Sequence, residues 1–189
     1  MDWQNHLDRI ASDIEPQLRK GHVATYIDAL ARIPKDRFGM AVRTIDGREF
    51  ITGDGEAPFS IQSISKLFTL TMAMNFLGDR LWKKVGREPS GNPFNSLVQL
   101  EHESGIPRNP LINAGAHVVT DCLAAHCARP RQDIIGFVRH LAGNPAIDYD
   151  AEVAESERLT GYRNFALANF LKSFGNLDND VDDVLDLYF

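Results

Sequence analysis

A serine and a lysine three residues apart are the strongest candidates for chemistry in this sequence. They are Ser63 and Lys66, in the stretch FSIQSISKLFTLTMAMNFLG at 59–78. Residues three apart on a helix lie close enough to touch, whereas adjacent residues diverge. Ser65 adjoins the lysine and Ser60 lies six residues before it, so the spacing selects Ser63. A serine hydroxyl becomes a nucleophile when a base removes its proton, and we expect Lys66 to be that base.

Lys66 can accept a proton only when it is neutral, which requires burial or nearby positive charge to lower its pKa. The apolar run LFTLTMAMNFL that follows it predicts this burial. Near a helix N-terminus, Ser63 would also have a free backbone N–H where an oxyanion forms. The alternative is chance, because a chain of this length contains on the order of one S-x-x-K. Ser60 would then cap the helix and Lys66 would extend to solvent.

Hydrophobic periodicity predicts a chain that is rich in helix and has one hairpin. Alternating residues on both sides of Asp46-Gly47 predict strands at 37–45 and 48–53. A lone hairpin is marginal in water, so further strands are expected beside it. The other predicted elements are a loop at 87–96 and helices at 3–19, 22–34, 59–78, 78–86, 110–128, 131–143, 150–161, 162–176 and 182–189.

The length of 189 residues fits a single domain with its own core. A net charge of −6 without a basic stripe excludes a nucleic-acid-binding groove. No membrane span is expected, because Thr69, Thr71 and Asn75 interrupt the longest apolar run. The charged, amphipathic N-terminus has no signal core, which predicts a cytoplasmic protein.

The cysteines, Cys122 and Cys127, are too few for a disulfide framework. Cys122 and His126 are four residues apart and could share a helix face as metal ligands. No second pair of comparable spacing exists, so we interpret the cysteines as reduced, partly buried thiols and expect no metal site.

Six segments in order, from Tyr26 to Tyr188, resemble the serine-dependent glutaminase family: GHVATYIDALA, FSIQSISKLF, EPSGNPFNS, NPLINAGA, SERLTGYRNFALANFLKSFGN and VLDLYF. The resemblance implies a β-lactamase/transpeptidase-like α/β fold of the α+β type, with an incomplete antiparallel sheet represented by one hairpin. It implies hydrolysis of the side-chain amide of L-glutamine to L-glutamate and ammonia, through a Ser63 acyl-enzyme with Lys66 as base. It also implies that no cofactor is needed and that the protein forms dimers or tetramers.

The resemblance carries the family's glutamine-binding positions onto Tyr26, Gln62, Ser63, Asn113, Glu157, Asn164 and Tyr188. These side chains suit an α-amino acid, because a carboxylate can pair with its ammonium group and Asn and Tyr can donate to its carboxylate. Family members continue beyond the position that matches Phe189, into a segment with a further active-site tyrosine, an oxyanion-hole N–H and more strands. We therefore expect 1–189 to be one glutaminase domain without its C-terminal third, and to be weakly active or inactive alone.

Two other functions use the same residues. A penicillin-recognising enzyme shares S-x-x-K but also needs a K-[ST]-G strand, which KSFG at 172–175 does not provide. Such enzymes also carry an export signal, which we do not find in the N-terminal segment. A catalytically impaired fragment that binds glutamine or oligomerises without turnover would retain Asn113, Glu157 and Asn164.

Overall fold

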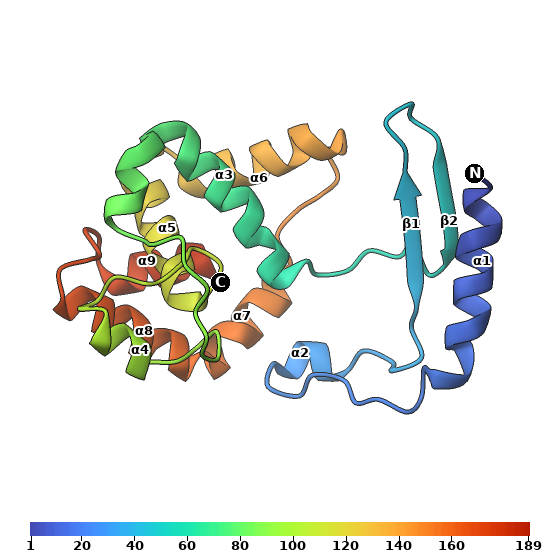
Figure 1. Cartoon of the computed structure of the whole chain (residues 1–189), viewed down its shortest axis with the longest axis horizontal. Helices are drawn as coiled ribbons and strands as arrows, with labels where there is room; N and C mark the ends of the chain where they lie inside the picture. The colour runs from blue at the N-terminus through green and yellow to red at the C-terminus, as the bar shows by residue number, and fades with distance from the viewer. The chain divides into compact units, whose positions relative to one another are not determined.

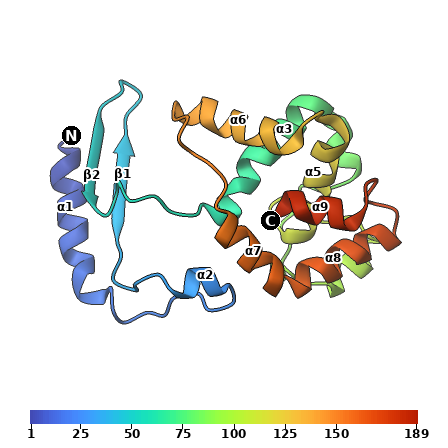
Figure 2. The same ribbon diagram turned by 180° about the vertical axis from the view of Figure 1, so that it is seen from behind.

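The structure, a computed structural model, describes residues 1–189 as two compact units, Met1–Ser60 and Ile61–Phe189. Figures 1 and 2 show the elements of each unit from opposite sides. No helix combines the length and apolar character that a bilayer span requires.

The N-terminal unit is built on a β-hairpin. Strand β1 (Gly39–Arg43) pairs antiparallel with strand β2 (Glu49–Gly53). The turn between them contains Gly47 at a φ of 86°, a left-handed conformation that glycine adopts without a steric penalty. The hairpin predicted around Asp46-Gly47 is therefore confirmed.

Helix α1 (Trp3–Ile14) lies beside β2 (Figure 1), and a 3-10 turn, η1 (Glu15–Gln17), extends it. The Gln4 side chain donates to the backbone oxygen of Ile51 at 3.0 Å and ties the helix to the strand. The prediction for 22–34 was too long, because only α2 (Asp28–Ala31) is helical there. The residues before it include Val23, Thr25 and Ile27, whose branched side chains disfavour helix.

The C-terminal unit is helical and surrounds one buried helix. Its elements are η2 (Gln62–Ile64), α3 (Ser65–Leu77), η3 (Gly78–Lys83), α4 (Val98–His102), α5 (Asn113–His126), α6 (Pro130–Ala142), α7 (Ala151–Thr160), α8 (Tyr162–Ser173) and α9 (Val181–Tyr188). Every residue of α5 from Asn113 to Leu123 is buried. Helices α3, α6, α8 and α9 contact α5, and α9 and α5 lie side by side in Figure 2.

Small residues allow this central position. A Cβ atom on Gly115 would lie 1.9 Å from the backbone oxygen of Asn109, so the loop before α5 passes against its first turn. Apolar side chains of the surrounding elements fill the core, among them Leu81, Leu167 and Leu185.

Most predicted helices of this unit are confirmed, and the differences lie at short elements. The segment predicted as a helix at 78–86 forms the 3-10 helix η3, and α4 was missed altogether. Gly143, predicted to follow the end of a helix, adopts the left-handed conformation just after α6. The helix predicted from 59 begins only at Ser65 and is preceded by the turn η2.

Candidate active site

The Lys66 amine is at the centre of a buried polar cluster. Lys66 is the second residue of α3, and only 6% of it is exposed. Its Nζ donates to Asn113 Oδ1 at 2.8 Å and to the backbone oxygen of Leu111 at 3.2 Å. Asn113 Nδ2 donates in turn to Asn164 Oδ1 at 3.0 Å. Residues predicted from separate segments on α3, α5 and α8 therefore form one hydrogen-bonded chain.

The local sequence explains why two oxygens face this amine. The Asn109 side chain accepts hydrogen bonds from the backbone N–H groups of Leu111 and Ile112, which fixes a turn before α5. That turn presents the Leu111 carbonyl to Lys66. Gly115 allows the turn to pass close to the helix, as described above.

The surroundings of Lys66 favour its neutral form. Burial lowers the pKa of Lys66 to about 8, although the negative charge of Glu157 acts in the opposite direction. The amine also lies near the N-terminal ends of α3 and α5, whose partial positive charge disfavours a cation. A neutral amine has two N–H groups and one lone pair. Two acceptors are present, so the lone pair remains available for a proton.

Ser63 lies in the turn η2, just before Lys66, and is exposed. The two residues therefore do not share an α-helix as predicted, but residues three apart also align in a 3-10 turn. No hydrogen bond joins the Ser63 hydroxyl to the Lys66 amine in this structure. Catalytic hydrogen bonds often form only once substrate is bound, so the pair remains a candidate.

Gln62 immediately before Ser63 has a φ of 47°, which is unusual for a residue other than glycine. Holding such a residue in a left-handed conformation costs on the order of 1 kcal/mol. Backbone strain of this kind is common at functional sites.

Glu157 is a half-buried residue of α7. Burial raises the pKa of its carboxyl group, while the positive charge of Lys66 lowers it. The two groups therefore influence each other's charge, which places Glu157 near the cluster although no hydrogen bond joins them.

Tyr188 ends α9, and its ring lies edge-on to the imidazole of His117, with the ring centroids 4.4 Å apart. His117 belongs to α5, one turn after Asn113, and is fully buried. Sequence reasoning missed it, although a histidine within a run of small and apolar residues was a usable signal.

Tyr26 lies in the N-terminal unit and is 70% exposed, so its part in the site stays a prediction.

The thiols and a surface groove lie outside this cluster. Burial raises the pKa of Cys122 to about 11, which keeps this thiol protonated. His126 Nδ1 donates to the carbonyl oxygen of Cys122, so that nitrogen is not free for a metal.

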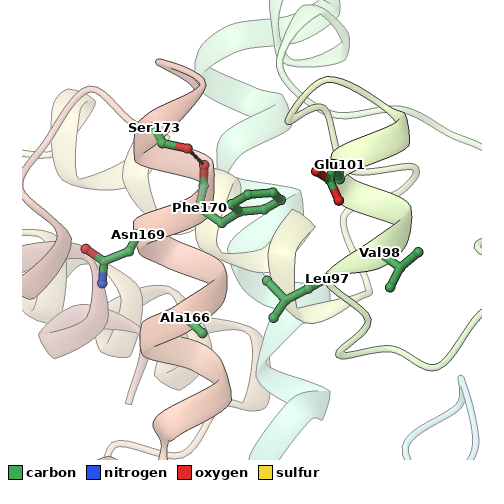
Figure 3. Close-up of a pocket in the computed structure, with 7 residues that line it drawn as sticks. All are labelled: Leu97, Val98, Glu101, Ala166, Asn169, Phe170 and Ser173. Carbon is green, nitrogen blue, oxygen red and sulfur yellow. Dashed lines mark hydrogen bonds between the residues drawn. The ribbon is translucent and has the colours of Figure 1, made fainter.

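An apolar groove of about 440 Å³ lies between α4 and α8, and the Phe170 ring points across it (Figure 3). None of the predicted site residues lines the groove.

Comparison with known proteins identifies the family. The family model for glutaminase matches residues 21–189. The chain belongs to the glutaminase family. It is 54% identical to the glutaminase of Rhizobium johnstonii and 56% identical to the thermolabile glutaminase of Rhizobium etli, each over 191 residues. Both alignments cover 100% of this chain, and the chain spans 62% of the length of either relative.

Solved glutaminase structures share the fold. A structure described as the probable glutaminase YbaS matches 97% of this chain and 61% of its own, with a TM-score of 0.87 and 34% identity. The native form of Mglu matches 100% of this chain and 46% of its own, with a TM-score of 0.89 and 32% identity. The predicted helix-rich, β-lactamase-like α/β fold is therefore confirmed.

Proposed function

We propose that this member of the glutaminase family hydrolyses the side-chain amide of L-glutamine to L-glutamate and ammonia, with Ser63 as nucleophile and Lys66 as general base. The observation that carries the proposal is the Lys66 amine, which is buried, bonded to two acceptors and lowered in pKa to about 8. Membership of the glutaminase family supports the same reaction.

Acylation begins when Lys66 Nζ removes the proton from Ser63 Oγ as this oxygen bonds to the amide carbon of glutamine. The resulting ammonium of Lys66 then gives a proton to the amide nitrogen. The carbon–nitrogen bond breaks, ammonia leaves, and a glutamyl ester remains on Ser63. Lys66 is neutral again and can act a second time.

Deacylation repeats these steps with water as the nucleophile. Lys66 takes a proton from the water as its oxygen attacks the ester carbon. The ester bond to Ser63 Oγ breaks, the serine regains a proton from Lys66, and L-glutamate leaves. Two acceptors on the lysine suit both stages, because they hold the amine in place while its third position gains and loses the proton.

The amide orientations in the cluster support substrate binding by Asn164. Lys66 Nζ donates to the Asn113 oxygen, and the Asn113 nitrogen donates to Asn164. Asn164 then accepts with its oxygen, and its own N–H groups remain for the substrate α-carboxylate. Glu157 would bind the α-ammonium group, and Gln62 and Tyr188 would complete the part of the site in the C-terminal unit. The family resemblance also assigns a substrate contact to Tyr26.

The test is the glutamyl ester itself. The purified chain is mixed with L-glutamine, quenched in acid and weighed by intact-protein mass spectrometry. We expect the mass of one glutamyl group to be added, and to disappear in Ser63→Ala and Lys66→Met. Ser65→Ala is the matched control, because that serine adjoins the lysine and should keep the adduct. An adduct that survives Ser63→Ala would contradict the proposal.

A second candidate is a chain that binds glutamine without turnover. It is favoured by the missing hydrogen bond between the Ser63 hydroxyl and the Lys66 amine. Calorimetry with L-glutamine, run beside an ammonia assay, separates the two functions. Binding without an adduct or ammonia would favour this candidate.

We also propose that the two units belong to one glutaminase domain, because the family match runs across both of them. A cytoplasmic location and assembly into a dimer or tetramer complete the proposal. Sedimentation equilibrium tests the assembly, and a monomer at all concentrations would contradict it.

A further inference from the structure

Three buried polar residues occupy successive turns of α5. They are Asn113, His117 and Asp121, spaced four apart, so they lie along the same side of the helix. Buried polar side chains nearly always have hydrogen-bond partners, because leaving them unpaired is unfavourable. The first and third of these residues obey this rule and the second does not.

Asp121 is fully paired. Its carboxylate accepts hydrogen bonds from the backbone N–H groups of Asp178 and Asn179, at 2.9 to 3.0 Å, and from the Asn179 side chain. The Lys84 amine lies 3.4 Å away. Asp178 and Asn179 form the segment that leads into α9, so Asp121 fixes where that helix starts.

His117 is fully buried, and neither ring nitrogen has a hydrogen-bond partner among the protein atoms. Its closest aromatic neighbour is Tyr188, whose ring is nearly perpendicular at 87°. Perpendicular rings at this distance attract each other, because the positive edge of one faces the negative face of the other. Tyr188 is the last residue of α9, so α5 contacts this helix at both ends.

Its protonation state excludes His117 as the base of the reaction. Burial, together with the nearby charge of Lys66, lowers the pKa of His117 to about 3. The imidazole is therefore neutral throughout the range in which Lys66 titrates, and it does not compete for the serine proton. A leucine would fill the same space without an unpaired polar atom, so stability alone does not account for a histidine at this position.

We propose that His117 is a positioning residue for Tyr188, and that its imidazole holds the phenol ring at the end of α9 in the orientation that binds the substrate. The inference rests on the proposed glutamine site for its functional meaning. The contact between the rings can be tested without it.

The test compares His117→Leu, which removes the ring, with His117→Phe, which keeps a ring and removes the nitrogens. Leu123→Met is the control, because it alters an equally buried residue of α5 conservatively. Calorimetry measures the affinity for L-glutamate. Nuclear magnetic resonance of labelled tyrosine measures the environment of the Tyr188 ring without ligand, and Tyr188→Phe identifies its signals among those of the 4 tyrosines.

We expect His117→Leu to weaken L-glutamate binding by up to about tenfold and to shift the Tyr188 ring signals. His117→Phe should stay close to the unsubstituted chain in both measurements, and the titration of Lys66 should not move in either variant. Equal losses in both variants, or unchanged Tyr188 signals in a folded His117→Leu chain, would overturn the inference. If the unsubstituted chain does not bind L-glutamate, the proposed function fails, and the Tyr188 signals alone decide the role of His117.

Discussion

Replacing Lys66 with methionine should change how stability depends on pH. Burial lowers the pKa of this lysine from 10.5 to about 8 in the folded chain. Between these values the unfolded chain carries the proton and the folded chain does not, so stability rises with pH. One pH unit corresponds to about 1.4 kcal/mol, so the lysine contributes about 3 kcal/mol over this window. Below pH 8 this stabilisation is absent.

The Lys66→Met variant lacks this titration. As the pH rises from 8 to 10.5, the unsubstituted chain should therefore gain about 3 kcal/mol of unfolding free energy relative to the variant. Methionine also leaves Asn113 Oδ1 and the Leu111 oxygen without their donor, but that cost is the same at every pH and does not affect the pH dependence. Urea titrations at several pH values measure the stability difference between the two chains.

Lys83→Met serves as the control, because this exposed lysine lies in the same unit. It shows how much of the change results from losing any lysine. A difference between Lys66→Met and the unsubstituted chain that stays constant from pH 8 to 10.5 would refute the claim that the amine is neutral in the folded state. A difference that changes in the opposite direction would refute the sign of the shift.

Three further predictions concern the same cluster. The rate of glutamyl-ester formation should rise about tenfold from pH 6 to 7 and level off above the Lys66 pKa of about 8. Quenched-flow mass spectrometry measures this rate, and a rate independent of pH would contradict Lys66 as the base. Gly115→Ala places a methyl group 1.9 Å from the Asn109 oxygen and should lower the melting temperature, whereas Gly136→Ala meets no atom within 4 Å and should raise stability by about 0.5 kcal/mol. Asn113→Leu removes the acceptor of Lys66 and the donor of Asn164 and should destabilise the chain by about 3 kcal/mol in urea titrations; a neutral effect would mean that the hydrogen-bonded chain is unimportant.

The long elements of the fold could be predicted from sequence because their signals are local. The Asp46-Gly47 turn and the alternating strands beside it specify a hairpin without reference to the rest of the chain. Short elements could not be predicted in this way. A helix of five residues such as α4 has too little periodicity to recognise, and it is stabilised by packing rather than by intrinsic preference.

The candidate site was only partly accessible from sequence. Spacing selected Ser63 and Lys66, and the family resemblance supplied Asn113 and Asn164. The bond from Lys66 to the Leu111 carbonyl could not be foreseen, because backbone oxygens have no signature in a sequence. The role proposed for His117 rests on a ring contact between α5 and α9, which lie far apart in the chain, so the sequence alone does not suggest it.

The buried polar groups of the C-terminal unit differ in how well their burial is compensated. Asp121 receives several hydrogen bonds and fixes a loop, as a structural residue does. Lys66 lies buried with its pKa lowered, and His117 lies buried with both ring nitrogens unpaired. A core selected for stability alone would replace these two residues with apolar ones. We therefore interpret the buried Lys66 amine and the unpaired His117 ring as groups kept for their proposed roles at the expense of stability.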